Sequence, residues 1–318
     1  MFENNYEVLK QIVDEKAVIR HVSKHRNPDG SMDIKGNLKI WNDAVARFET
    51  IKLWDKTPNF DDRDPNQIEP NIVFVPSSCN AKRGTIIVAC GGGFETRTGC
   101  EGFNVAKYFV DKGFNTAILT YRLKPYGRKD AMDDMQRAIC VLRHKKDELN
   151  ITDKICCMGF SAGGMLTGNV ATHFDYGNEN ATDEVEKESC HIDAAVLGYG
   201  AFCFAGLPGG FFVDPFSDKI RNPFFANKEE LLYYSPEVNI TKETCPFFIW
   251  QTNSDDPRNS FCLGQALTAM GVPFEMHLFP EGVHGLALAD GNNDLGMDLP
   301  HVSKWTDLCS EWLEKQGI

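Results

Sequence analysis

The stretch that decides the fold lies at residues 154–164 and reads KICCMGFSAGG. An apolar run ends there in a G-x-S-x-G pattern with Ser161 at its centre. This pattern is typical of a sharp turn from a strand into a helix, where small flanking residues avoid collisions with the neighbouring strand and helix. Such a turn holds the serine hydroxyl above the sheet. Because many ordinary turns are rich in glycine and serine, the pattern indicates catalysis only if the partners of a nucleophilic serine are also present.

Candidate partners for Ser161 follow it in the chain. A serine hydroxyl needs a base to take its proton and a carboxylate to orient that base. Asp255 and Asp256 come after the apolar run 246–250, and His284 follows the strand-like run 273–278. Serine hydrolases with a parallel sheet place their acid and then their histidine just beyond strand ends, in this order. The sequence therefore predicts His284 as the base and leaves both aspartates open as the acid.

A glycine-rich loop precedes the serine and follows another apolar run, residues 85–90. It reads Gly91-Gly92-Gly93-Phe94, and backbone without side chains can turn its N–H groups toward an oxyanion. We expect this loop to supply one or two donors, with Gly92, Gly93 and Phe94 as the candidate oxyanion or substrate-binding residues, and Ala162, directly after the nucleophile, to supply another. A plain tight turn is the second interpretation. A nucleotide site ranks well below both, because the loop lacks the Gly-Lys-Ser/Thr of a Walker motif and the third glycine of a dinucleotide fingerprint.

Composition narrows the class of partner. The chain has 318 residues and a net charge of −12, which argues against nucleic acid or an anionic membrane, since both call for a basic face. A small neutral substrate fits better. The N-terminus has no basic or apolar leader and no stretch approaches a membrane-spanning length, so we expect a cytoplasmic protein.

The cysteines and the metal-binding motifs bear on disulfide and metal sites. Without a secretion signal, the eleven cysteines are expected to be reduced and buried rather than paired. There is no Cys-x-x-Cys and no His-Glu-x-x-His, so the sequence supports no metal site. The predicted chemistry needs no cofactor.

Apolar runs alternate with amphipathic stretches, which predicts an α/β fold with a mostly parallel sheet and crossover helices. The expected strands are 85–90, 115–121, 154–158, 193–198, 246–251 and 273–279. The expected helices are 101–113, 131–149, 162–174, 259–271 and 303–315. No linker divides the chain after about residue 45, so we expect one catalytic domain over 46–318.

Two segments fall outside this alternation. Residues 1–45 form an N-terminal arm with a predicted helix from Tyr6 to His21, followed by a polar stretch; it is open whether the arm acts as a cap, a homo-oligomer contact or a docked extension. Residues 200–233 are rich in phenylalanine and glycine and lie between a strand and the candidate acid. Hydrolases commonly insert loops or lids there. A core-filling role for these aromatics is an equal alternative to a wall of the substrate pocket.

Over residues 49–318 the chain resembles the α/β-hydrolase superfamily, in the bacterial branch of acetyl-xylan-esterase-like and BD-FAE-like serine esterases. The ordered matches to that branch are Leu53-Trp54, Gly91-Gly92-Gly93-Phe94, Glu101-Gly102, Tyr121-Arg122-Leu123, Asp134 to Ala138, Gly159 to Gly164, Asn259-Ser260, Gly271 to Glu275, His284-Gly285 and Trp312-Leu313. Counted from Trp250, the resemblance favours Asp255 as the acid.

Three departures from the family pattern stand out. Met165 replaces a usual histidine, and Cys90 replaces a proline or histidine before the glycine triplet. Neither position belongs to the triad, so these two changes bear on packing and pocket shape. The loop between the acid and Asn259 is shortened, and a shift of register in it would make Asp256 the acid instead.

The resemblance implies a serine carboxylesterase that acts on short acyl esters, especially acetyl esters, of carbohydrates or other small alcohols. In a cytoplasmic protein the substrate would be an imported acetylated oligosaccharide. A peptidase or a lactone hydrolase of the same fold is the alternative enzyme. A ligand-binding homologue without catalysis is the alternative from another functional class. Such proteins often lose a residue of the triad, whereas this sequence has a candidate for each of the three.

Overall fold

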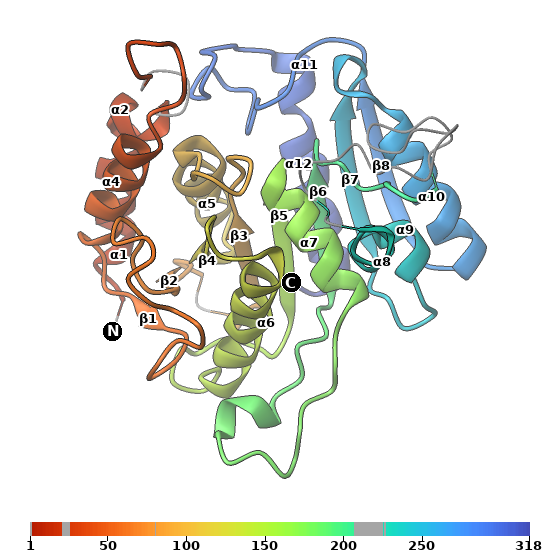
Figure 1. Ribbon diagram of the computed structural model, residues 1–318. Coiled ribbons are helices and arrows are strands. Elements are labelled where there is room, and N and C mark those ends of the chain that lie inside the picture. The colour runs from red at the N-terminus through yellow and green to blue at the C-terminus, as the bar shows by residue number, and fades with distance from the viewer. Residues whose placement is uncertain (1, 21–25, 80, 207–224, 226) are drawn as a thin grey trace.

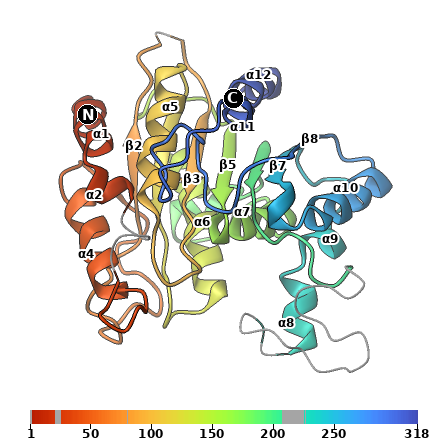
Figure 2. The same ribbon diagram turned by 90° about the horizontal axis from the view of Figure 1, so that it is seen from above.

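The computed structural model describes residues 2–20, 26–79, 81–206, 225 and 227–318. Its centre is one eight-stranded sheet with helices on both faces (Figure 2). The strands are β1 (Ile51–Lys52), β2 (Asn71–Val75), β3 (Thr85–Ala89), β4 (Asn115–Thr120), β5 (Ile155–Phe160), β6 (Ala194–Gly198), β7 (Phe247–Thr252) and β8 (Phe274–Phe279).

The sheet has the order β1-β2-β4-β3-β5-β6-β7-β8. The pairs from β4 through β3 to β8 are all parallel. At one edge β2 pairs antiparallel with both β1 and β4. The carboxyl ends of the parallel strands therefore lie at one edge of the sheet, where α/β proteins bind their ligands. This arrangement confirms the predicted α/β-hydrolase fold.

All six predicted strands are present, with bounds that differ by at most two residues. Strands β1 and β2 were not predicted. The run Asn71-Ile72-Val73-Phe74-Val75 carries a readable signal, because it is apolar and buried along its whole length. The two residues of β1 are too few to show a period.

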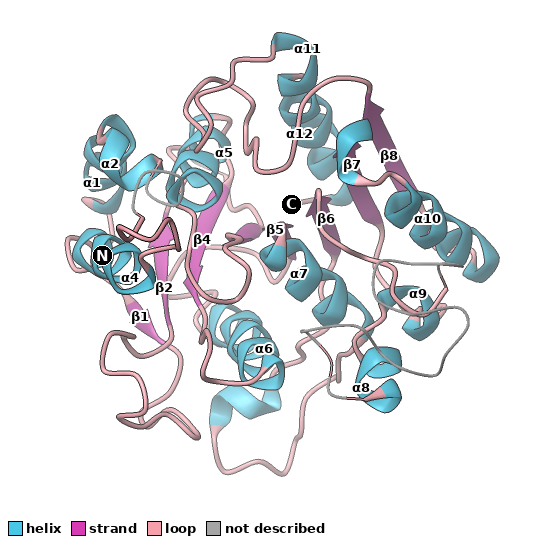
Figure 3. Ribbon diagram, turned by 45° about the horizontal axis from the view of Figure 1, so that its top comes forward, coloured by secondary structure: helices cyan, strands magenta, loops and turns pink. Residues whose placement is uncertain are grey.

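Helices cover the sheet as crossover connections (Figures 1 and 3). The helices that connect consecutive strands from β3 to β8 are α5 (Val105–Asp111), α6 (Arg128–His144), α7 (Ala162–Thr172), α8 (Lys228–Tyr233), α9 (Pro236–Asn239) and α10 (Arg258–Met270). Helices α11 (Pro300–Ser303) and α12 (Trp305–Gln316) follow the last strand. Short turns of other helix types are η1 (Cys100–Asn104), η2 (Glu184–Lys187) and η3 (Asn253–Asp255). The predicted helix 131–149 is displaced toward the N-terminus, because Asp130 accepts the Gly127 N–H and starts α6 there.

Two hydrophobic cores lie on opposite faces of the sheet. Residues of α6, α7 and α10 contribute to one, and residues of α5 and α12 contribute to the other. Strand residues alternate between the two, as Ile87 and Val88 of β3 illustrate. None of the helices in the described part of the chain is both long enough and apolar enough to span a bilayer.

The N-terminal segment contains three described helices, α1 (Asn5–Asp14), α2 (Lys16–Ile19) and α4 (Ile34–Val45). The predicted single helix from Tyr6 to His21 is interrupted at Glu15, whose backbone is extended, and His21 lies outside the described residues. Helix α4 was not predicted, because polar residues lie between the buried side chains of its apolar face, such as Leu38 and Trp41. The side chain of Asp33 caps its N-terminus by accepting the Gly36 N–H. These helices extend the core that contains α5.

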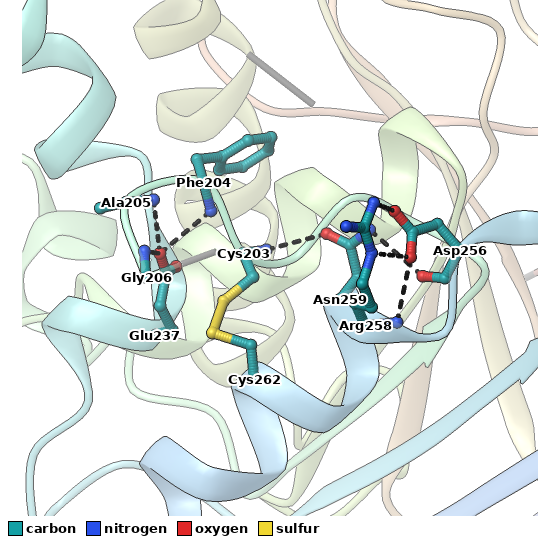
Figure 4. Close-up of a disulfide and its surroundings, with 9 residues drawn as sticks. All are labelled: Cys203, Phe204, Ala205, Gly206, Glu237, Asp256, Arg258, Asn259 and Cys262. Atoms are coloured by element: carbon teal, nitrogen blue, oxygen red, sulfur yellow. Dashed lines mark hydrogen bonds and ion pairs between the residues drawn. A yellow bond between two sulfur atoms is a disulfide. The ribbon is translucent and has the colours of Figure 1, made fainter. Parts of the chain in front are cut away.

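The expectation that the cysteines are all reduced is wrong for one pair. Cys203 and Cys262 form a disulfide between the segment after β6 and helix α10 (Figure 4). Their Cα atoms are 6.3 Å apart, a separation that a disulfide can bridge. The sequence does not reveal this proximity, because the two cysteines are 59 positions apart in the chain. Among the other cysteines, eight are buried thiols and Cys79 is exposed.

The predicted insertion at 200–233 lies largely outside the described residues. The described parts are 200–206, Phe225 and 227–233. Phe202, Phe204 and Phe225 are buried in the core that contains α7, so these three aromatics fill the interior.

Candidate active site

Ser161 lies at the junction of β5 and α7, in a backbone conformation that residues other than glycine rarely adopt. Its φ and ψ are 51° and −119°. The surrounding glycines make the turn possible, because a Cβ on Gly159 would lie 2.0 Å from the Gly163 carbonyl oxygen and a Cβ on Gly163 would lie 2.0 Å from that of Ala89. The strain that this turn stores is typical of functional sites.

The structure brings Ser161, His284 and Asp255 into one hydrogen-bonded chain. The serine Oγ lies 2.7 Å from Nε2 of His284. The Nδ1 atom of the same ring lies 2.7 Å from Oδ2 of Asp255. If Nδ1 carries the proton, Nε2 is free to accept the proton of the serine hydroxyl, as a general base must.

Asp256 is directed elsewhere. Its backbone is left-handed, with φ of 46°, so the carboxylate turns away from that of its neighbour. It pairs with Arg258, which donates from Nε at 2.7 Å and from Nη2 at 2.6 Å (Figure 4). These hydrogen bonds lower the pKa of Asp256. Of the two aspartates that the sequence left open, the geometry therefore favours Asp255 as the partner of His284.

The pKa of His284 is raised above the usual histidine value. Burial among its neighbours lowers it, but the hydrogen bond and charge of Asp255, with the charge of Glu101, outweigh that effect. The ring is still 52% exposed, so one side of it faces the solvent at the pocket. A raised pKa means that the imidazolium is stabilised, which is the form that arises when the base has taken the serine proton.

The glycine loop faces Ser161. Gly92 and Gly93 line the same pocket as Ser161 and His284, and both have positive φ, at 126° and 65°. Within the described chain the amides of these two glycines donate to no protein acceptor. The Ala162 amide is the first of α7 and has no acceptor within the helix. The structure thus places three candidate donors near the serine.

Phe94 behaves differently from its two glycine neighbours. Its side chain is buried and packs edge-on against Tyr121. Its carbonyl accepts the Lys124 N–H at 2.9 Å. The structure does not bring the Phe94 side chain into the pocket at Ser161.

A pocket of about 420 Å³ opens at the serine. Its walls include Glu95 and Asp294, and also two N-terminal residues, Arg26 and Met32. Sequence reasoning missed Arg26 and Met32, because a polar arm far from the motif carries no signal of where it docks. Another hollow of about 440 Å³ lies beside α6 and is lined by Trp54, Arg137 and others, but it includes no residue of the serine site.

The described residues contain no group of three or more histidine, cysteine or acidic side chains arranged to hold a metal ion. The two cysteines near the glycine loop, Cys90 and Cys100, are fully buried, and burial raises the pKa of both thiols. A buried thiol with a raised pKa is a poor nucleophile. In this site the serine is the candidate nucleophile.

Comparison with known proteins agrees with this geometry. The BD-FAE family model matches residues 72–267, more than half of the chain. The chain belongs to the BD-FAE family. It is thereby an α/β-hydrolase of the esterase branch that the sequence motifs resemble, which confirms that part of the sequence analysis.

A curated protein and a solved structure are each more than 30% identical to this BD-FAE member. Endo-1,4-beta-xylanase B of Butyrivibrio fibrisolvens is 32% identical over 305 residues, which are 91% of this chain but 45% of that protein, so the chain spans less than half the length of this relative. The crystal structure of an acetyl ester-xyloside bifunctional hydrolase from Caldicellulosiruptor lactoaceticus is 33% identical, with a TM-score of 0.74, and the match covers 85% of this chain and 96% of that one.

More distant structures share the fold of the BD-FAE member. The carboxylesterase Cest-2923 from Lactobacillus plantarum is 24% identical with a TM-score of 0.63, and the match covers 78% of this chain and 92% of that one. The native esterase Est2 from Thermogutta terrifontis is 20% identical with a TM-score of 0.67, over 93% of this chain and 97% of that one.

Proposed function

We propose that this protein is a serine carboxylesterase that removes acetyl or similarly short acyl groups from carbohydrates. The observation that carries the proposal is the chain of two 2.7 Å hydrogen bonds from Ser161 through His284 to Asp255. This geometry is the one that activates a serine hydroxyl.

In the proposed reaction Ser161 Oγ attacks the ester carbonyl carbon while His284 Nε2 takes the hydroxyl proton. Asp255 holds the ring and stabilises the imidazolium. The negative charge on the carbonyl oxygen is met by amides of Gly92, Gly93 and Ala162, each contributing roughly 3 kcal/mol in comparable sites. His284 then protonates the departing alcohol, and a water activated by the same ring hydrolyses the acyl-enzyme.

The names of two relatives and the character of the pocket support a sugar as the alcohol. One relative is named a xylanase and another an acetyl ester-xyloside hydrolase. The pocket walls carry Arg26, Glu95 and Asp294, which can hydrogen-bond to hydroxyl groups.

The same proposal includes a cytoplasmic location, with imported oligosaccharides as substrates. The Cys203–Cys262 disulfide does not support this location, because disulfides are rare in cytosolic proteins.

Acetylated xylo-oligosaccharides test this proposal. We expect acetate release from them by the wild-type protein, little hydrolysis of p-nitrophenyl octanoate and no cleavage of peptides. Turnover of long-chain esters or peptides only would contradict the proposed substrate class. Asp255→Asn serves as the inactive comparison, because it keeps the shape of the site and removes the carboxylate that orients His284.

A further inference from the structure

A second carboxylate lies beneath the proposed site. Glu101 belongs to η1, a single turn of π-helix, and is 2% exposed. Such turns are common at functional sites. Among the described residues Glu101 forms no ion pair, so its charge is not neutralised by a neighbouring lysine or arginine. Burying a carboxylate without an ion-pair partner costs folding free energy, so the position of Glu101 needs a physical explanation.

Both oxygens of Glu101 accept hydrogen bonds from parts of the active site. Oε2 accepts the Gly91 N–H at 2.7 Å, at the start of the glycine loop. Oε1 accepts the hydroxyl of Tyr199 at 2.7 Å. A Cβ on Gly91 would lie 2.7 Å from both Glu101 Oε2 and Ser161 Cβ, which shows how closely the carboxylate, the loop and the serine pack.

Tyr199 extends the connection to the histidine. Its hydroxyl accepts the Ala287 N–H at 2.9 Å, three residues after His284. Its ring packs edge-on against the His284 ring, with centroids 5.1 Å apart. Tyr199 directly follows β6 and has a positive φ of 36°, so the chain holds it in an uncommon conformation. Glu101 and Tyr199 together join the glycine loop to the histidine loop.

The hydrogen bonds favour the anionic form of Glu101. The Gly91 N–H can only donate, and the Tyr199 hydroxyl, which accepts the Ala287 N–H, donates its own hydrogen to Glu101. Burial is the largest effect and leaves the pKa of Glu101 above the usual carboxyl value, while the hydrogen bonds from Tyr199 and Gly91 and the charge of His284 oppose that rise. The same attraction contributes to the raised pKa of His284, so each of the two groups stabilises the charged form of the other.

We propose that Glu101 is a positioning residue of this active site, which aligns the glycine loop with the histidine loop and stabilises the imidazolium of His284 as a second anion behind Asp255. This inference rests on the proposed esterase function. The other charged groups around His284 are Asp255 on the loop after β7 and the pocket residues Arg26, Glu95 and Asp294, while Arg258 is engaged by Asp256.

The test is Glu101→Gln, which keeps the shape and removes the charge. Titration of ¹³C-labelled histidine by NMR, with His284 assigned from the His284→Asn spectrum, is expected to show the pKa of His284 falling by roughly half a unit or more. The acidic limb of kcat/KM should move to lower pH with it. We expect kcat to fall by about tenfold or more, with a smaller change in KM.

Tyr199→Phe separates the positioning role of Glu101 from its electrostatic role. It also provides a test if Glu101→Gln fails to fold. It keeps the Glu101 charge but breaks the bond to the histidine loop, so kcat should fall while the pKa of His284 is retained or rises. An unchanged kcat in Tyr199→Phe would overturn the positioning role.

Glu237→Gln is the matched control. Glu237 is also a buried carboxylate, and it accepts the N–H groups of Phe204, Ala205 and Gly206, away from His284 (Figure 4). We expect this variant to leave the pKa of His284 unchanged. The same His284 pKa in wild type and Glu101→Gln would overturn the electrostatic role. Because NMR needs no turnover, a wild-type protein without esterase activity would refute the proposed function separately.

Discussion

Asp255 and Asp256 are neighbours in the chain, yet their carboxylates have different partners. One lies 2.7 Å from the His284 ring, and the other pairs with Arg258. The sequence alone could not separate them, because the difference depends on the left-handed backbone at Asp256. Ser161 and His284, in contrast, could be selected from their motifs and their places after predicted strands. Their catalytic role stays a prediction until it is measured.

Two matched substitutions test the assignment of the acid. Asp255→Asn is expected to lower kcat by roughly three to four orders of magnitude, because the His284 tautomer is no longer held. Asp256→Asn should keep near-wild-type kcat and lose about 1 kcal/mol of stability or less, since asparagine tolerates a left-handed backbone and the lost ion pair is exposed on the Arg258 side. The reverse pattern of steady-state rates would assign the acid to Asp256.

The raised pKa of His284 predicts the pH dependence of hydrolysis. The base must be neutral to accept the serine proton, so kcat/KM should rise with pH through a midpoint above about 6.5, the ordinary histidine value. Removing the Asp255 charge should move this midpoint to lower pH, because the imidazolium loses its main stabilisation. A wild-type profile with its midpoint below the ordinary value would contradict this electrostatic account.

At the scale of elements, the predictions succeed where a run of residues carries its own period. Five of the six predicted strands are buried along their whole length, and the sixth, the edge strand β8, alternates apolar residues with Glu275 and His277. The sequence located all six. Helix α4, strand β1 and the Cys203–Cys262 disulfide were not predicted, because all three depend on tertiary packing. The pocket contribution of Arg26 and Met32 escaped for the same reason.

The turn between β5 and α7 predicts an element-scale sensitivity. Gly163→Ala places a methyl group 2.0 Å from the Ala89 carbonyl oxygen, so β3 and α7 must move apart. We expect a loss of roughly 3 kcal/mol or more in the free energy of unfolding. Gly164→Ala is the control, because its nearest contacts are 3.2 Å and alanine favours a helix. Chemical denaturation of both variants measures this, and equal stabilities would contradict the steric argument.

At the scale of the whole molecule, segments far apart in sequence meet at one pocket. The N-terminal residues Arg26 and Met32 line the same pocket as Ser161, His284, Asp294 and Leu295. The N-terminal helices themselves pack on the core around α5. The described part of the arm therefore packs on the body of the protein and contributes residues to the pocket lining. Whether it influences substrate choice can be measured.

Arg26→Ala tests this influence. Arg26 is exposed, so its removal should leave the fold and the turnover of p-nitrophenyl acetate nearly unchanged. For an acetylated oligosaccharide, which extends farther along the pocket, we expect KM to rise severalfold with little change in kcat, since only ground-state binding is lost. Equal KM values for both substrates in wild type and variant would show that the arm does not contact the alcohol.

The central claim is that Ser161 is the nucleophile of an esterase. The most direct measurement is hydrolysis of p-nitrophenyl esters from acetate to octanoate by the wild type and by Ser161→Ala, with thermal melts to verify that both are folded. We expect turnover of the short esters by the wild type and its loss by several orders of magnitude in the variant. Full ester turnover by folded Ser161→Ala would contradict it.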